Sequence, residues 1–306
     1  MELNEINKTY GFVPPYKKCS KCAQIIFAKV FKYQEVYFFC PSCKVQTKWN
    51  YNTIISKMQI SSEHLTHLIT MFLNRRSPSE ANEILKYDFV NLSLNKKTID
   101  HYFSIFNRIV MEYYLQELDS VVFEGELELD ESHLFKEKAS FAPHRLYSNH
   151  AVWLFGICQR KSNKFIIFPI SNRQEQNLKK IIFKFIKAGS TIYTDCFSSY
   201  VNNHVFPRKS KLSNYSYIHF FINHKKEFVS QLFKHIHTNK IESLWKQVKQ
   251  QIRRERITTF YIPAIARFYF FRTLHYNDQK KLIENGLLSN QLGEFEDLIK
   301  IILNKF

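Results

Sequence analysis

The chain has few glycines, no long apolar run and a shortage of acidic residues. Its 306 residues include six glycines, and its 27 acidic residues are outnumbered by 44 lysines and arginines. No stretch reaches the roughly 18 consecutive apolar residues that a membrane-spanning helix requires. The first residues, MELNEINKTYGFVPP, lack the charged and apolar segments of a secretory signal. We therefore expect an intracellular protein without a membrane partner.

The surplus of cations gives a formal net charge of +17 and is spread along the whole chain instead of one tail. Such a charge favours a polyanionic partner, most simply nucleic acid, because neutralisation of phosphates is the main source of a basic protein's affinity for nucleic acid. The 29 Phe and 17 Tyr, beside so few glycines, are typical of an AT-rich coding sequence. Aromatic richness is therefore no indication of base stacking here. The length allows two or three modules.

Four of the six cysteines form two CxxC pairs, Cys19 with Cys22 and Cys40 with Cys43. Two such pairs supply four thiolates to one tetrahedral zinc ion, and short strands between them would make a zinc ribbon over residues 1–52. The alternatives are two disulfides, which an intracellular setting disfavours, or a redox pair, which needs a βαβ pattern that is absent here. We expect one structural Zn²⁺, because four thiolates leave no open position for chemistry.

Residues 53–120 have the periodicity of a helical module. Ser77 and Glu80 make a capping-box pattern at the start of a second helix, and a third helix follows the loop DFVNLSLN. This order is typical of a helix-turn-helix module, in which Lys96 and Lys97 at the start of the third helix would face the DNA major groove. Trihelical packing without a nucleic-acid role is the alternative, since the loop lacks the glycine often found in such turns.

From Val121 the apolar period changes to two, which predicts a strand VVFEGELELD with four acids on one face. These acids are Glu124, Glu126, Glu128 and Asp130. A solvated edge strand would account for Glu124 and Glu126. Two strands joined as a hairpin, a helix, a strand ending at Asp195, a helical turn FSSYVNN, another strand and a last helix are predicted to follow.

This order of elements is the one an RNase H-like domain requires, with a mixed five-stranded sheet and flanking helices, and we assign it to residues 121–275. Asp130 would lie on the central strand and Asp195 at the end of the fourth, while Glu242 projects toward both from the last helix. Three carboxylates converging in this way can hold two divalent cations for an in-line phosphoryl displacement. Hard oxygen ligands favour Mg²⁺, or Mn²⁺ in its place.

The last helix, HTNKIESLWKQVKQQIRR, has an apolar stripe and a polar face. Asn239, Glu242, Lys246, Lys249 and Arg253 fall inside a sector of roughly 80° at 100° per residue. A solvated surface helix with a Glu242–Lys246 ion pair is the alternative. If Glu242 is a metal ligand, the three cations lie where a DNA backbone would pass.

Three segments resemble the transposases of the IS1595/IS1016 type, which carry the ISXO2-like transposase domain and are related to the eukaryotic Merlin transposons. They are ELDES around Asp130, YTDCFSSY around Asp195 and HTNKIESLWKQVKQQIRR around Glu242, and the cysteine pairs match that family's zinc ribbon. The resemblance implies a DDE triad of these three acids, followed by the cation Lys249. Some members have Asn as the third residue, and Asn239 lies one turn before Glu242. We prefer Glu242, because an anionic oxygen binds Mg²⁺ better than a neutral amide.

The resemblance also implies an activity and partners. A transposase would bind terminal inverted repeats in double-stranded DNA and then cleave and transfer strands, in the nucleus of a eukaryotic host or the cytoplasm of a bacterium. Pairing two DNA ends implies a homo-oligomer, at least a dimer. The alternatives are a catalytically silent or domesticated zinc-ribbon DNA-binding protein and an RNase H-like nuclease. Residues 276–306 are expected to form a C-terminal helical tail.

Overall fold

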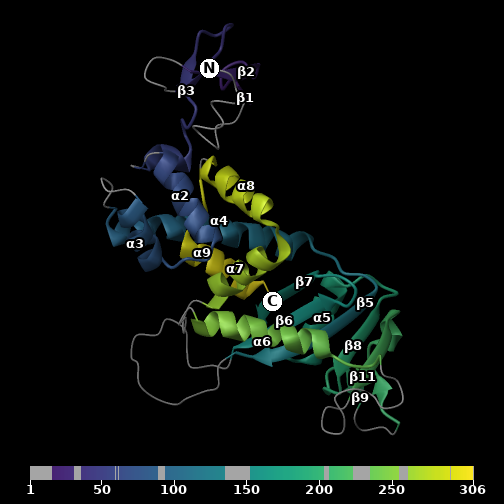
Figure 1. The fold of residues 1–306 in the computed structure, drawn as a ribbon. Helices are drawn as coiled ribbons and strands as arrows, with labels where there is room; N and C mark the ends of the chain where they lie inside the picture. The colour runs from purple at the N-terminus through teal and green to yellow at the C-terminus, as the bar shows by residue number, and fades with distance from the viewer. Residues whose placement is uncertain are drawn as a thin grey trace. The chain divides into compact units, whose positions relative to one another are not determined.

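The computed structural model describes residues 16–305 apart from 31–35, 59, 61, 89–93, 135–151, 203–206, 223–234, 255–260 and 290. The chain divides into two compact units (Figure 1). The first unit comprises Met1–Glu112 and Leu274–Glu294, and the second comprises Tyr113–Thr273 and Phe295–Phe306. Each unit is therefore assembled from two separate stretches of the sequence.

The N-terminal part of the first unit is a four-stranded antiparallel sheet in the order β1-β2-β3-β4. Its strands are β1 (Tyr16–Lys18), β2 (Ile25–Val30), β3 (Val36–Phe39) and β4 (Gln46–Lys48). One CxxC lies in the turn between β1 and β2, and the other lies between β3 and β4. Ile26, Ala28 and Phe38 pack with Cys19 and Cys40 as a small core. This sheet with its clustered cysteines confirms the predicted zinc ribbon.

The rest of the first unit is helical. It contains the 3-10 helix η2 (Ile54–Lys57), α2 (Ser62–Leu73), α3 (Pro78–Asp88), most of α4 (Lys96–Ser120) and α8 (Tyr276–Leu287). The capping box is present, because the Ser77 N–H donates to Glu80 Oε2 at 2.7 Å and the Glu80 N–H donates to Ser77 Oγ at 3.2 Å. At Gly286 of α8, an added Cβ would lie 2.6 Å from the Ile109 side chain of α4. The missing side chain thus lets α8 pack closely on α4.

The second unit is built on a mixed five-stranded sheet with the order β11-β8-β5-β6-β7. Its strands are β5 (Glu126–His133), β6 (Trp153–Gln159), β7 (Phe165–Ile170), β8 (Thr191–Asp195) and β11 (Ile218–Ile222). The first three are antiparallel neighbours, while β8 pairs in parallel with both β5 and β11. The strand that carries Asp130 is therefore central, and Asp195 ends the fourth strand, as the sequence predicts.

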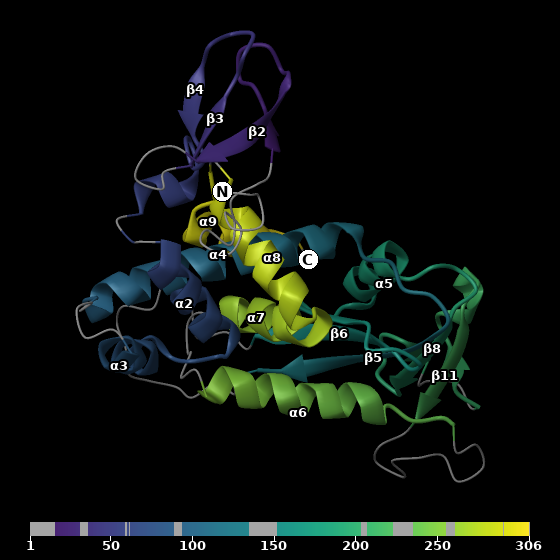
Figure 2. The ribbon, with the colours of Figure 1, turned by 45° about the horizontal axis from the view of Figure 1, so that its top comes forward.

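Helices flank this sheet. They are α5 (Glu175–Phe185), α6 (Asn239–Arg254), α7 (Tyr261–Thr273), α9 (Phe295–Asn304) and the end of α4. Helix α6 packs on β5 and β6, and Figure 2 shows it running alongside β5. Helices α7 and α9 pack on β7. The predicted tail 276–306 is thus divided, with α8 in the first unit and α9 in the second.

Two predicted elements differ from the structure. The strand expected from Val121 begins at Glu126, because Gly125 has a φ of +83° and interrupts the extended run. The segment predicted as a helical turn, FSSYVNN, instead ends in β9 (Val201–Asn202), which pairs with β10 (Lys209–Ser210). Val201 is fully buried, and its β-branched side chain suits a strand better than a helical turn.

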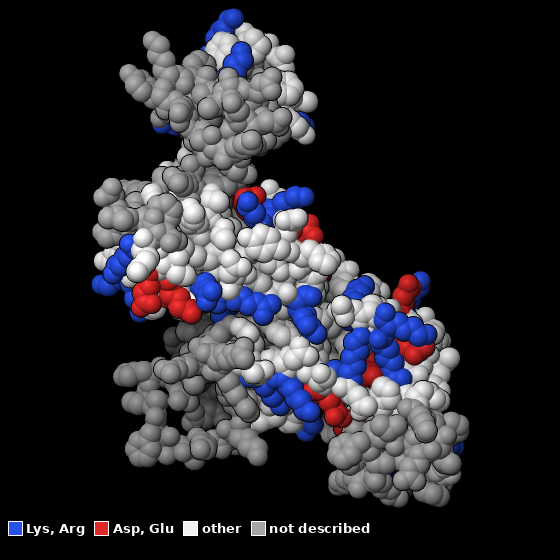
Figure 3. Space-filling model, viewed as in Figure 1, with Lys and Arg blue, Asp and Glu red and all other residues white. Residues whose placement is uncertain are grey.

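Cations recur over the surface of the described residues. Figure 3 shows Lys and Arg side chains on both units, with fewer acidic side chains among them. No helix in the described part of the chain is both long and apolar enough to cross a membrane.

Candidate active site and metal centre

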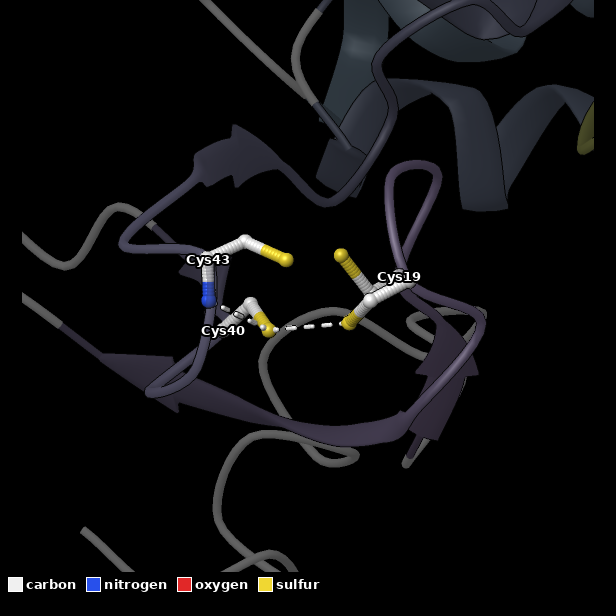
Figure 4. Close-up of side chains that lie close together, drawn as sticks. Cys19, Cys40 and Cys43 are labelled. Carbon is white, nitrogen blue, oxygen red and sulfur yellow. Dashed lines mark hydrogen bonds between the residues drawn. The ribbon is translucent and has the colours of Figure 1, made fainter.

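The four cysteine thiols of the N-terminal sheet converge on one point. Their sulfur atoms all lie within 4.8 Å of one another, and Figure 4 shows the side chains of Cys19, Cys40 and Cys43 close together. Cys22 Sγ lies 3.6 Å from Cys40 Sγ. That separation is far longer than a disulfide of about 2.05 Å, and all four cysteines are free. Backbone N–H groups of Lys21 and Cys43 donate to the sulfurs of Cys19 and Cys40, each at 3.5 Å. The donor set fits one tetrahedral structural zinc ion.

The two cysteine turns have the same backbone. Ala23 and Lys44, each directly after the second cysteine of a pair, have φ values of 60° and 59°. Each N–H donates to the carbonyl of the first cysteine of its pair at 2.9 Å. A left-handed conformation costs a non-glycine residue about 1–2 kcal/mol, so its use at both turns indicates that the turns are shaped to aim sulfurs. Hydrogen bonds from the backbone N–H groups of Lys21 and Cys22 are the main cause that lowers the pKa of Cys19 to about 7.

In the second unit, Asp130 and Asp195 lie at the same level on neighbouring strands. Strands β5 and β8 pair in parallel as far as Glu128 with Tyr193, and each aspartate comes two residues later on its own strand. Burial raises the pKa of Asp130 to about 7, and the charges of Asp195 and Glu242 also contribute to this increase. We call Asp130, Asp195 and Glu242 the acid cluster.

Helix α6 is hydrogen-bonded directly to the strand that carries Asp130. The indole N–H of Trp245 donates to Asp130 Oδ2 at 2.9 Å. Gly156 pairs with Asp130 on β6, and an added Cβ there would lie 2.8 Å from the Trp245 ring and 2.9 Å from Ile241. A glycine is therefore needed for α6 to lie this close to the sheet. Sequence reasoning overlooked both Gly156 and Trp245, although Trp245 lies only one turn beyond Glu242.

A fourth acid, Glu128, anchors the start of α6. Its side chain is fully buried, and its Oε2 accepts the backbone N–H groups of Lys240 at 2.9 Å and Ile241 at 3.0 Å. Its Oε1 accepts a hydrogen bond from Arg160 Nε at 2.9 Å. The carboxylate thus satisfies helix N–H groups that have no partner within α6, and its charge is favourable at a helix N-terminus. The sequence places Glu128 on an acidic strand face but does not reveal this contact.

Arg160 joins Glu128 to the segment that leads into α6. Its guanidinium lies 3.4 Å from the centroid of the Tyr193 ring and donates to the carbonyls of His235, at 2.6 Å, and His237. The Nδ1 atom of His237 also lies 3.5 Å from Glu128 Oε1. These contacts fix where α6 begins, and hence where Glu242 lies along the sheet.

The remaining predicted site residues of α6 differ in exposure. Glu242 is partly buried, and its Oε1 accepts a hydrogen bond from Thr238 Oγ at 3.3 Å. Asn239 is exposed at the first position of the helix, Lys246 is exposed and Lys249 is partly buried. The side chain of Arg253 lies outside the described residues.

The predicted DNA-contacting lysines of the helical module lie in the first unit. Lys96 and Lys97 are exposed in the first turn of α4, where Asn95 Oδ1 accepts the Lys97 N–H at 3.1 Å and caps the helix. Cations are electrostatically unfavourable at a helix N-terminus. Helix stability therefore does not explain this pair of lysines.

The acid cluster fits divalent cations through its donor chemistry. Hard carboxylate oxygens are the ligands that Mg²⁺ and Mn²⁺ prefer. Two ions about 3.5–4 Å apart can be shared by carboxylates that come from different elements of the fold.

Comparison with known proteins agrees with this geometry. Residues 122–264 match the family model of the ISXO2-like transposase domain, and the match includes all three residues of the acid cluster. No curated protein matches the chain. Residues 122–264 thus form an ISXO2-like transposase domain, the domain of the IS1595-type DDE transposases.

Proposed function

We propose that the chain is a DNA transposase that binds terminal inverted repeats and catalyses metal-dependent strand cleavage and strand transfer. The observation that supports this most is the acid cluster within the matched domain, where Asp130 and Asp195 lie at the same level on neighbouring strands. Burial raises the pKa of Asp130, and the charges of Asp195 and Glu242 add to that increase. Like charges held together are unfavourable unless a cation compensates them. A protein that only bound DNA would gain nothing from this arrangement, which favours the catalytic function over the silent alternative.

Asp130, Asp195 and Glu242 would hold two divalent cations, Mg²⁺ or Mn²⁺. Such ions, when bound, activate the attacking oxygen and stabilise the leaving oxygen of an in-line displacement at phosphorus. Trp245 holds the Oδ2 atom of Asp130 and so fixes the orientation of this carboxylate. Glu242 is the better third ligand than Asn239, because it is an anion and its charge acts on Asp130.

The cations around the acid cluster would bind the DNA backbone. Lys246 and Lys249 lie one and two turns beyond Glu242 on α6, and Arg253 follows one turn later. Neutralising phosphates along this line would supply affinity without sequence preference. Lys96 and Lys97 on α4, together with the zinc ribbon, would recognise the DNA ends. A homo-oligomer, at least a dimer, would hold two ends together.

Cleavage assays test this proposal. Purified wild-type protein with Mg²⁺ should nick duplex DNA at an inverted-repeat end, and Asp130→Asn, Asp195→Asn and Glu242→Gln should each lose activity by several orders of magnitude. Glu126→Gln is the matched control, because Glu126 lies on the same strand but pairs with the exposed Lys161. Undiminished cleavage by the two aspartate variants would overturn the triad.

The same assay separates the alternative functions. Binding of the ends by wild-type protein without cleavage at any Mg²⁺ concentration would favour the silent DNA-binding protein. Cleavage of unrelated duplexes or RNA–DNA hybrids as fast as inverted-repeat ends would favour the nuclease. Asn239→Ala should retain activity if Glu242 is the third acid.

A further inference from the structure

Arg173, in the segment between β7 and α5, lies between two aromatic rings. Its guanidinium carbon is 3.6 Å from the centroid of the Trp153 ring and 4.5 Å from that of Phe197. The His133 ring follows Trp153 at 4.9 Å between centroids. All four side chains are partly exposed, and we call them the arginine clamp. Stacking of this kind holds a planar guanidinium in one orientation and leaves its N–H edge available.

The arginine clamp is joined to the end of β8, which carries Asp195. The Phe197 N–H donates to Asp195 Oδ1 at 2.9 Å. The hydroxyl of Ser199 donates to the Arg173 carbonyl at 2.8 Å, which fixes the backbone of the arginine to the same turn. His133 lies on β5 three residues beyond Asp130, so its side chain is on the opposite face of the sheet from that acid, and the link to the acid cluster runs through Asp195. Arg173 is therefore held next to the turn that follows Asp195 and belongs to neither α6 nor α4.

The N–H groups of the Arg173 guanidinium donate to no acceptor among the described residues. Within the described residues, no oxygen accepts a hydrogen bond from the Arg173 side chain and no ion pair forms with it. The acid that it influences electrostatically is Glu131, but Glu131 Oε1 accepts its hydrogen bond from the Tyr200 hydroxyl instead. A guanidinium has five N–H donors in a rigid fork. Because the part of the chain that the structure describes provides no acceptor for this fork, the fork is available to a ligand.

We propose that Arg173 binds a DNA backbone phosphate adjacent to the phosphodiester that lies at the acid cluster. This inference depends on the proposed function, because DNA is the ligand. A guanidinium fork matches the oxygens of a phosphate with two parallel hydrogen bonds. The stacking on Trp153 and Phe197 orders the fork before DNA arrives, so less side-chain entropy is lost on binding. The contact would place the reacting strand relative to Asp195.

The test combines protein variants with DNA in which one phosphate is replaced by a neutral methylphosphonate. Binding to uncleaved end DNA is measured with Ca²⁺, whose oxygen preference resembles that of Mg²⁺. Arg173→Gln should weaken binding about tenfold, as expected for a lost charge-assisted hydrogen bond. It should also reduce the slope of log affinity against log salt by about 0.9. Arg173→Lys should bind at an intermediate level, because lysine keeps the charge without the fork.

The matched control is Lys187→Gln, which removes an exposed cation of the same unit that pairs with Glu124. It should change neither affinity nor salt slope measurably. Circular dichroism and thermal unfolding verify that each variant is folded.

The decisive comparison is a double-mutant cycle. With wild-type protein, methylphosphonate at one position near the cleavage site should weaken binding about as much as Arg173→Gln does on unmodified DNA. With Arg173→Gln, the same modification should cause no further loss of affinity. If the losses of binding free energy from Arg173→Gln and from methylphosphonate add at every phosphate position, the inference is overturned, even if the variant is less stable than wild-type protein. If wild-type protein still cleaves the DNA, the proposed function would stand. Wild-type protein that binds no DNA would overturn both.

Discussion

Trp245 donates its indole N–H to Oδ2 of Asp130 at 2.9 Å, so the helix that carries Glu242 is hydrogen-bonded to the strand that carries the first aspartate. This bond favours the ionised carboxylate and opposes the effects of burial and neighbouring charge on the pKa of Asp130. Five predictions follow from the contacts around this pair and from the metal sites.

Trp245→Phe should raise the pKa of Asp130, because it removes the donor and keeps most of the apolar packing. Cation binding needs the ionised acid, so the acid limb of the cleavage rate should move to higher pH, with little change at the alkaline plateau. A pH–rate profile at fixed Mg²⁺ measures this. An unchanged acid limb together with a lower plateau would mean that the indole matters only for packing.

Without Mg²⁺ the stability of the second unit should fall as pH rises. The folded pKa of Asp130, about 7, lies above the ordinary value of 3.8, so the folded state holds a proton that the unfolded state has already released. The contribution of Asp130 to stability is fully present below about pH 4 and is lost progressively up to about pH 7. Asp130→Asn should abolish this contribution. Thermal unfolding across that range checks it, and a wild-type slope that persists in Asp130→Asn would contradict it.

Glu128→Gln should destabilise the protein by about 3–5 kcal/mol, because it leaves Arg160 in a buried ion pair without its partner. It should also reduce cleavage, since the start of α6 is no longer fixed. Urea unfolding measures the stability. Glu126→Gln is the control and should change it by less than about 1 kcal/mol, because its pair with Lys161 is exposed. If Glu128→Gln and Glu126→Gln changed the free energy of unfolding and the cleavage rate equally, Glu128 would have no particular role in positioning α6.

Gly156→Ala should destabilise the protein by about 1–3 kcal/mol through overpacking against the Trp245 ring. Adding Trp245→Leu should relieve that clash, so the double variant should be more stable than the sum of the single effects predicts. Urea unfolding of the four proteins gives the coupling. Strict additivity would show that Gly156 is not where α6 meets the sheet.

Cys43→Ser should abolish binding of one zinc ion per chain, because the remaining three thiolates no longer close the tetrahedral site. Cys196→Ser, which changes a partly buried thiol in the other unit, should leave the zinc content unchanged. Metal analysis of the purified proteins measures both. Zinc retained by Cys43→Ser in full would contradict the four-thiolate site.

The features that follow local sequence rules were predictable. The CxxC spacing predicts the cysteine cluster, the Ser77 and Glu80 pattern predicts a capping box that the structure contains, and period-two alternation predicts the strand that carries Asp130. The order of elements predicts a mixed sheet with that strand at its centre.

The contacts that hold the site together were not predictable, because their partners are distant in sequence. Glu128 meets Lys240 more than a hundred residues later, and Arg173 lies between rings from β6 and from the turn after β8. The acidic residues of β5 look alike in the sequence, yet Glu126 pairs with the exposed Lys161 while Glu128 is buried at a helix end. Only the packing of α6 on the sheet separates these roles.

The central claim is that Asp130, Asp195 and Glu242 together hold two catalytic cations. Counting bound Mn²⁺ by electron paramagnetic resonance on the complex with end DNA tests it most directly. The account predicts two ions per chain for wild-type protein, Glu126→Gln and Asn239→Ala, and fewer than two for Asp130→Asn, Asp195→Asn and Glu242→Gln. Two ions retained by Glu242→Gln and lost by Asn239→Ala would contradict it.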